Sequence, residues 1–184
     1  MARLFVAIPF SDEAQARFLA MQPPASAGVR LSKREELHVT LQFLGEVADD
    51  HHVLVRNTLA TVKVSPFTIT LRGLGQFPPE GAPQVLWSRV EPSPFLSALH
   101  HAIGAALTDA IGFRPESRPY TPHVTLAYVK ESLAPDQWEA YLRTHDAVPT
   151  FSVLVNRFAL YSSTRMEDGP QYQVQAEFDL SETA

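Results

Sequence analysis

Two histidines of this chain stand in the same four-residue word, one in each half of the sequence. His38 begins the first copy of HVTL and His123 begins the second. Side chains of an extended strand alternate between its two faces, so each histidine shares a face with the threonine two residues later, Thr40 or Thr125. The valine and leucine of each word can anchor the strand in the core. Each word therefore predicts an imidazole and a hydroxyl side by side on one strand face.

A pair of such motifs is suited to acid–base chemistry. Histidine titrates near neutral pH, so one imidazole can accept a proton while a second, as imidazolium, donates one. The threonine hydroxyls can donate hydrogen bonds to anionic oxygens. In-line cleavage of a phosphodiester needs a base on one side of phosphorus and an acid on the other. Two similar half-chains that face each other would bring these four side chains into one cleft and allow this reaction without a metal ion.

Simpler interpretations of the histidines stay open. A single H-x-T match arises often by chance, and an ordinary strand histidine is the alternative for either copy alone. A zinc site is a further alternative, although zinc commonly takes three or four protein ligands and the two words supply two histidines with no carboxylate. The other histidines are expected on helices or loops, as surface or boundary residues: His51, His52, His100, His101 and His145.

The length, composition and net charge of the chain restrict its class. With 184 residues, of which 45% are hydrophobic, we expect one two-lobed domain over residues 1–184. The net charge of −5 argues against a long basic groove for nucleic acid, although local cations could hold a small anionic group. The absence of cysteine excludes disulfides and thiolate sites. No signal peptide or membrane span is expected, and the chain is predicted to be a cytoplasmic monomer without a cofactor.

Strands and helices are predicted in both halves. Apolar or alternating runs predict strands at residues 4–9, 37–44, 66–71, 85–90, 124–129, 151–161 and 172–180. Helical spacing predicts helices at residues 11–21, 49–62, 93–112 and 135–143. Short turns favour antiparallel or mixed pairing. The predicted class is α+β and bilobal, with two similar lobes of sheet, helices on the outer faces and a central cleft.

Further segments of the chain resemble one known family. RLFVAIPF, LHVTLQFLGEV, LGQFPPEGAPQVLW, RPYTPHVTLAYV and LYSSTRMEDGPQY are similar to landmarks of the two-histidine phosphoesterase superfamily, in family order over nearly the whole chain. Within it, the chain resembles the RNA 2′,3′-cyclic phosphodiesterases, once called 2′-5′ RNA ligases. The resemblance implies a bilobal α+β fold and metal-independent hydrolysis of a terminal ribose 2′,3′-cyclic phosphate to a 2′-phosphate. RNA 3′ ends with this group, or small cyclic nucleotides, are the implied partners.

The resemblance also implies roles for single residues. His38 would protonate the departing 3′ oxygen and His123 would activate water, with the assignment of the two roles left open. Thr40 and Thr125 would hold the nonbridging oxygens. Phe43 stands where the family often has an aromatic residue near the terminal base, although strand alternation puts it opposite His38 and core packing is the alternative.

Three more positions near the motifs bear on substrate binding. Arg118 could supply positive charge near the second motif, and a solvent-exposed side chain without such a role is the alternative. Family members often carry a basic residue where this chain has Gln42, and an arginine shortly after the second motif where it has Tyr128. These two differences concern contacts to phosphate or the RNA backbone. Two other functions stay open: the reverse reaction, which joins RNA ends in a 2′-5′ linkage, and a noncatalytic module that binds nucleotides or RNA ends.

Overall fold

The computed structural model describes residues 2–130, 138–141, 143, 150–167 and 169–181. Its strands are β1 (Ala2–Pro9), β2 (Val29–Leu31), β3 (His38–Val47), β4 (Phe67–Phe77), β5 (Val85–Val90), β6 (His123–Val129), β7 (Phe151–Val155), β8 (Arg157–Met166) and β9 (Gly169–Asp179). Its helices are α1 (Asp12–Ala20), α2 (His52–Ala60) and α3 (Pro94–Ile111), with short 3-10 helices η1 (Arg34–Glu36) and η2 (Asp49–His51). None of the helices in this described part is long and apolar enough to span a membrane.

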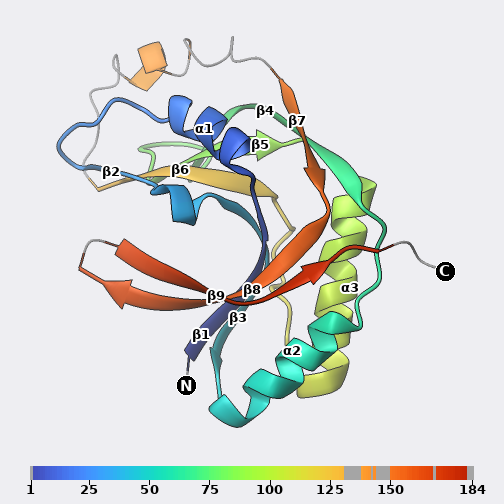
Figure 1. Cartoon of the computed structure of the whole chain (residues 1–184). Coiled ribbons are helices and arrows are strands. Elements are labelled where there is room, and N and C mark those ends of the chain that lie inside the picture. The colour runs from blue at the N-terminus through green and yellow to red at the C-terminus, as the bar shows by residue number, and fades with distance from the viewer. Residues whose placement is uncertain (1, 131–137, 142, 144–149, 168, 182–184) are drawn as a thin grey trace.

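The strands form two antiparallel sheets (Figure 1). One sheet has the order β3-β1-β8-β9, and the other has the order β2-β6-β5-β4-β7. The two H-x-T strands, β3 and β6, thus occupy matching places beside β1 and β5. The predicted α+β class with two similar lobes is confirmed, and the described strands pair only in the antiparallel sense.

Local signals set the helix ends where the sequence predicts them. The Ser11 hydroxyl accepts a hydrogen bond from the backbone of Ala14 at 3.3 Å and begins α1. The Ser93 hydroxyl accepts one from Leu96 at 3.2 Å and begins α3. Gly112 ends α3 in the left-handed conformation, which costs a residue without Cβ little. Residues 138–141 are also helical, and the rest of the helix expected at 135–143 lies mostly outside the described residues.

Two strand predictions are corrected. The run 151–161 is two strands, because the chain leaves one sheet at Asn156 and enters the other; β7 lies in the five-stranded sheet and β8 in the four-stranded sheet. The carbonyl of Asn156 accepts a hydrogen bond from Leu180 at 2.7 Å. The strand of the first motif does not end before Gly45 but continues to Val47, because Gly45 takes a φ of +70° within an irregular stretch of β3.

The helices cover the outer faces of the sheets, and a continuous apolar core joins them to both sheets. Phe18 of α1 packs against Phe151 of β7, with ring centres 5.4 Å apart. Helices α2 and α3 pack against each other, and α3 contacts β3. The inner sheet faces that carry the motif side chains are therefore left for a cleft.

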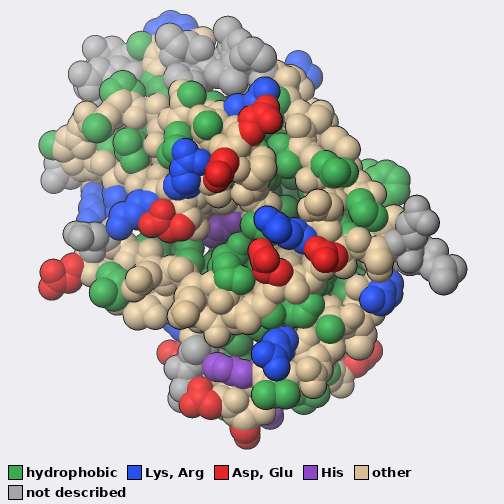
Figure 2. Space-filling model, viewed as in Figure 1, with side chains coloured by type: hydrophobic (Ala, Val, Ile, Leu, Met, Phe, Trp, Pro, Cys, Tyr) green, Lys and Arg blue, Asp and Glu red, His purple; other side chains and the backbone are tan. Residues whose placement is uncertain are grey.

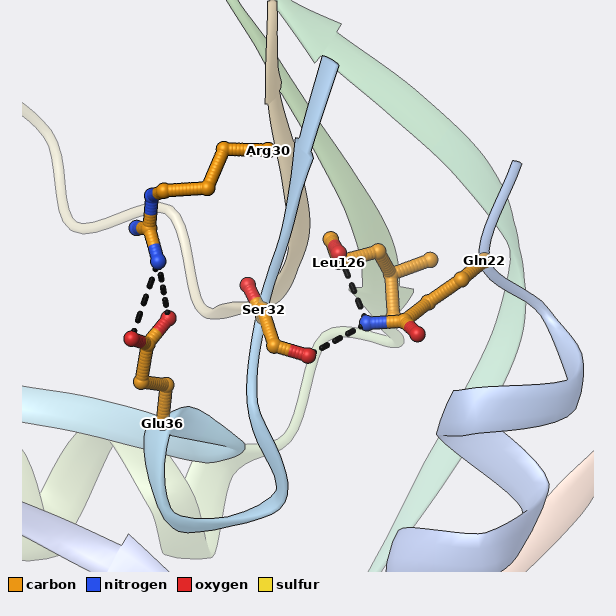
Figure 3. A network of polar contacts seen from close by, with 5 residues as sticks. All are labelled: Gln22, Arg30, Ser32, Glu36 and Leu126. Carbon is orange, nitrogen blue, oxygen red and sulfur yellow. Dashed lines mark hydrogen bonds and ion pairs between the residues drawn. The ribbon is translucent and has the colours of Figure 1, made fainter. Parts of the chain in front are cut away.

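One glutamine ties the end of α1 to the strands of the second motif. Nε2 of Gln22 donates hydrogen bonds to the carbonyls of Ser32 at 2.6 Å and Leu126 at 3.0 Å (Figure 3). Leu126 belongs to β6, and Ser32 directly follows β2. The same amide group therefore holds the helix, the edge strand and the motif strand together.

We predict that Gln22→Ala destabilises the fold by about 1–3 kcal/mol, since the partly buried carbonyl of Ser32 loses this donor. Urea denaturation followed by circular dichroism measures the change. Gln171→Ala, at an exposed position of β9, is the control and should change stability little. Equal unfolding free energies for the two variants would contradict the role given to Gln22.

Candidate active site

The two H-x-T strands pair with their neighbours in an identical register. In both pairs the histidine and threonine have direct partners, whereas the leucine that ends the motif is skipped. The matched positions are Pro9 with His38 and Ala7 with Thr40 in one sheet, and Arg89 with His123 and Trp87 with Thr125 in the other. The skipped residues, Leu41 and Leu126, are β-bulges. The repeated word is thus a repeated piece of backbone geometry.

The first bulge reverses the strand alternation beyond its motif. Leu41 and Gln42 are both buried, with exposed fractions of 2% and 4%. Phe43 then turns to the face that carries His38, where it lies opposite Phe5 and is 59% exposed. The prediction that Phe43 lies opposite His38 is therefore wrong, because the bulge inserts one extra residue between them.

Gln42 has a structural role in this arrangement. Its Nε2 donates a hydrogen bond to the carbonyl of His100 in α3 at 3.0 Å. Gly104 of α3 leaves room for the amide, because a Cβ at that position would lie 2.9 Å from Nε2. The side-chain amide of Gln42 thus joins β3 to α3.

Tyr128 occupies the place in β6 that Phe43 occupies in β3, as the fifth residue after the histidine. It lies opposite Arg30 of β2, and the guanidinium carbon is 4.4 Å from the centre of the tyrosine ring. Nη1 of Arg30 also donates to both carboxylate oxygens of buried Glu36, at 2.9 and 2.8 Å (Figure 3). At this position the chain thus has an aromatic ring covered by an arginine from the next strand.

Aromatic rings enclose His38. The ring centre of Phe5 lies 5.1 Å from that of the imidazole, and those of Tyr172 and Tyr161 lie 5.4 and 6.1 Å away. Burial, and next the charge of nearby His123, lower the pKa of His38 to about 4, and the backbone of Glu36 partly offsets the change. The lowered pKa favours the neutral imidazole of His38 at pH 7.

His123 has a similar environment in the other sheet. The ring centres of Phe77 and Trp87 lie 5.1 and 5.7 Å from that of the imidazole. Nδ1 of His123 donates a hydrogen bond to the carbonyl of Thr121 at 2.7 Å. Burial lowers the pKa of His123, and this hydrogen bond partly offsets the change. Because Nδ1 carries the hydrogen, Nε2 of the neutral ring is free to accept a proton.

A tyrosine joins the two motifs. The hydroxyl of Tyr120, three residues before His123, donates a hydrogen bond to the carbonyl of Thr40 at 2.9 Å. Its ring stacks on His100 of α3, with centres 3.9 Å apart. The segment that leads into the second motif is therefore fastened to the backbone of the first.

Two cavities that share lining residues lie along the cleft, and Figure 2 shows histidine in the hollow with both basic and acidic side chains around it. The smaller cavity has a volume of about 440 Å³ and the larger about 900 Å³. Phe43 and Glu116 line both cavities. The smaller cavity is also lined by several of the predicted or newly found site residues, namely Thr40, His123, Arg118, His100 and Tyr120.

The structure brings the predicted residues together to different degrees. Thr40, Phe43, Arg118 and His123 line one cavity. Thr125 is half-buried on the face of β6 that carries His123, and its hydroxyl interacts with the phenol of Tyr128. Among the described residues, no group of three or more histidine or carboxylate side chains is placed to hold a metal ion.

Several residues around the histidines were not predicted from the sequence. His100 is a boundary residue, as expected, but it also lines the smaller cavity; burial, and next the charge of His101, lower its pKa. Tyr172 and Trp87 reach the histidines from strands whose register a pattern does not give. The sequence contains one sign that aromatic side chains line the cleft. Both words continue to an aromatic residue at the same offset, as HVTLQF and HVTLAY.

Known proteins are similar to this chain in sequence. A protein of Geobacillus stearothermophilus named RNA 2′,3′-cyclic phosphodiesterase is 33% identical over 181 residues; the match covers 96% of this chain and 56% of that protein, so this chain spans little more than half of its length. A protein of the same name from Thermotoga maritima is 32% identical over 178 residues, with 94% and 92% covered.

Solved structures are similar to this chain in fold. TT0787 of Thermus thermophilus has a TM-score of 0.77 and 30% identity, with 97% of each chain covered. E. coli LigT complexed with 3′-AMP has a TM-score of 0.77 and 25% identity, with 98% of this chain and 99% of that chain covered. The model of the 2′-5′ RNA ligase superfamily matches residues 10–167. The chain therefore belongs to the 2′-5′ RNA ligase superfamily.

Proposed function

We propose that this protein is an RNA 2′,3′-cyclic phosphodiesterase that hydrolyses a terminal ribose 2′,3′-cyclic phosphate to a 2′-phosphate. The observation that carries the proposal is the identical, bulged geometry of the two H-x-T strands, with imidazoles close enough for the charge of one to lower the pKa of the other. The names of the relatives from Geobacillus and Thermotoga support the same reaction. Both motifs belong to one chain, so a monomer suffices for the proposed reaction.

In the proposed reaction, His123 acts as the base and His38 as the acid. Nε2 of His123 accepts a proton from water, whose oxygen attacks phosphorus as the bond to the 3′ oxygen breaks. His38, as imidazolium, donates a proton to that 3′ oxygen, which leaves the phosphate on the 2′ oxygen. The hydroxyls of Thr40 and Thr125 donate hydrogen bonds to the nonbridging oxygens, where negative charge is concentrated.

The enclosure of His38 couples its protonation to substrate binding. An imidazolium among the rings of Phe5, Tyr161 and Tyr172 is poorly solvated, and burial therefore favours the neutral form. A cyclic phosphate carries a negative charge and stabilises the imidazolium when it binds. The acid is thus charged chiefly in the complex, where a proton is required.

Phe43 is suited to hold the terminal base. It is 59% exposed at the junction of the two cavities, on the face that carries His38. An exposed ring beside a phosphate site offers a stacking surface that any base can use. Arg118 lines the same cavity and supplies positive charge for the substrate.

We predict that His38→Ala and His123→Ala each lower kcat/KM by about 10²–10⁴-fold, because each removes one proton-transfer group. The substrate is an oligoribonucleotide with a 2′,3′-cyclic phosphate, incubated with a chelator, and the product is identified by mass spectrometry and nuclease mapping. His51→Ala, at an exposed position of η2, is the control. Full hydrolysis by either variant, a 3′-phosphate product, or joined RNA ends in excess of hydrolysed ends would contradict the proposal.

The pH profile gives a second test. The lowered pKa values of both histidines place the maximum of kcat/KM below pH 6.5, since this ratio reports the free enzyme. Above both pKa values neither ring can donate a proton, and below both neither can accept one. The maximum of kcat lies at higher pH, because bound phosphate raises the pKa of the acid. Steady-state rates between about pH 3.5 and 8.5 measure both profiles. A kcat/KM maximum above pH 7 would show that the pKa values of the two histidines are not lowered in the free enzyme.

Replacement of the stacking surface tests substrate orientation. We predict that Phe43→Ala raises KM for an RNA end about tenfold, as expected for the loss of one base-stacking contact of about 1–3 kcal/mol. Phe95→Ala is a matched control, because Phe95 is 60% exposed on α3 and lines neither cavity. If the two variants have equal KM values, Phe43 does not contact the base.

A further inference from the structure

The larger cavity differs from the smaller one in its charge. Four cationic side chains line it, and the carboxylates on its wall are Glu116 and Glu167. The cations are Arg3, Arg30, Lys130 and Arg165. The chain as a whole has a net charge of −5, so this wall is locally positive on an acidic protein.

Three of these cations have no carboxylate partner in the part of the chain that the structure describes. Arg30 is held by Glu36 at 2.8 Å. Arg3, Lys130 and Arg165, by contrast, are exposed and make no ion pair with any carboxylate of the described residues. A guanidinium without a protein partner can form two parallel hydrogen bonds to a phosphate.

The strand register leads from His38 to these cations. Arg3 of β1 lies opposite Ser163 of β8, which lies opposite Tyr172 of β9. Partners across adjacent strands share a face, so Arg3 and Tyr172 lie on the face that Phe5 and His38 also share. The ring of Tyr172 contacts His38, with centres 5.4 Å apart. A strand of RNA that leaves the catalytic histidines along this face therefore meets Arg3.

The β8–β9 hairpin adds another cation to the same face. Arg165 lies opposite Pro170, two residue pairs beyond the pair of Ser163 and Tyr172. Side chains two residues apart in a strand point to the same face, so Arg165 shares the face of Ser163. Arg3 and Arg165 thus follow one another away from the histidines, while Phe43 marks the boundary with the smaller cavity.

We propose that the larger cavity is a subsite for the nucleotide that precedes the terminal one, with Arg3 and Arg165 bound to the backbone phosphates of that RNA. The cavity volume of about 900 Å³ lies in the range of sites for ligands of nucleotide size and larger. The proposal rests on the proposed function and makes the enzyme selective for oligonucleotide ends over mononucleoside 2′,3′-cyclic phosphates.

The test compares two substrates that end in the same nucleotide: a mononucleoside 2′,3′-cyclic phosphate and a tetranucleotide with the same cyclic end. The native enzyme should prefer the tetranucleotide in kcat/KM. Arg3→Gln and Arg165→Gln should each reduce this preference about tenfold, the loss expected for one charged hydrogen-bonding contact. Arg56→Gln, an exposed arginine on α2 outside both cavities, is the control and should keep the preference.

Salt gives an independent readout of the same contacts. The slope of log(kcat/KM) against log salt for the tetranucleotide should become shallower by about 0.7 for each arginine removed, as expected for one phosphate contact to a single strand. A purely structural effect of the substitutions would lower the rates for both substrates without changing this slope. No preference in the native enzyme, or an unchanged preference in both variants, would overturn the subsite.

Binding separates this subsite from the proposed reaction. A fluorescent tetranucleotide that ends in a 2′-phosphate should bind the native protein about tenfold more tightly than either variant, by anisotropy, even if no substrate is hydrolysed. Equal affinities would overturn the subsite, whatever the catalytic result. Failure to hydrolyse both substrates, with this binding difference intact, would refute only the proposed function.

Discussion

The bulged leucine in each H-x-T strand is the feature on which the cleft depends. Without it, strict alternation would turn the residue five positions after the histidine into the core. With it, Leu41 and Leu126 are buried together with the residue that follows each of them, and the next aromatic side chain returns to the inner face. One inserted residue in each strand therefore places an aromatic side chain on the face that carries the imidazole, where Phe43 and Tyr128 line the larger cavity.

The imidazoles are held by neighbours from distant parts of the chain. Tyr120 fastens the approach to the second motif onto the carbonyl of Thr40, and Arg30 of the five-stranded sheet binds Glu36, two residues before His38. Both contacts cross from one sheet to the segment that carries the other motif. The distance between the two rings is thus set by side-chain contacts across the cleft in addition to the packing of the core.

Local patterns predicted a large part of this structure. The ends of α3 follow from Ser93 and Gly112, whose effects act within one helical turn. The matching faces of His38 and Thr40 follow from alternation over three residues. The bulges could not be predicted this way, because a skipped partner depends on β1 and β5. The break at Asn156 is hidden for a similar reason: the chain is largely apolar on both sides of it, and the change of sheet depends on which strands pair with each side.

The two departures from the family pattern have different physical consequences. Gln42 is buried and bonded to α3, so its effect is on packing. Tyr128 brings Arg30 onto its ring, but the charge of Arg30 is largely neutralised by the buried carboxylate of Glu36. An arginine so paired attracts an anion less strongly than a free one, because the carboxylate repels the same anion. Arg3 and Arg165, on the inner face of the four-stranded sheet, make no ion pair with a carboxylate of the described residues, so we expect them to attract backbone phosphate more strongly than Arg30 does.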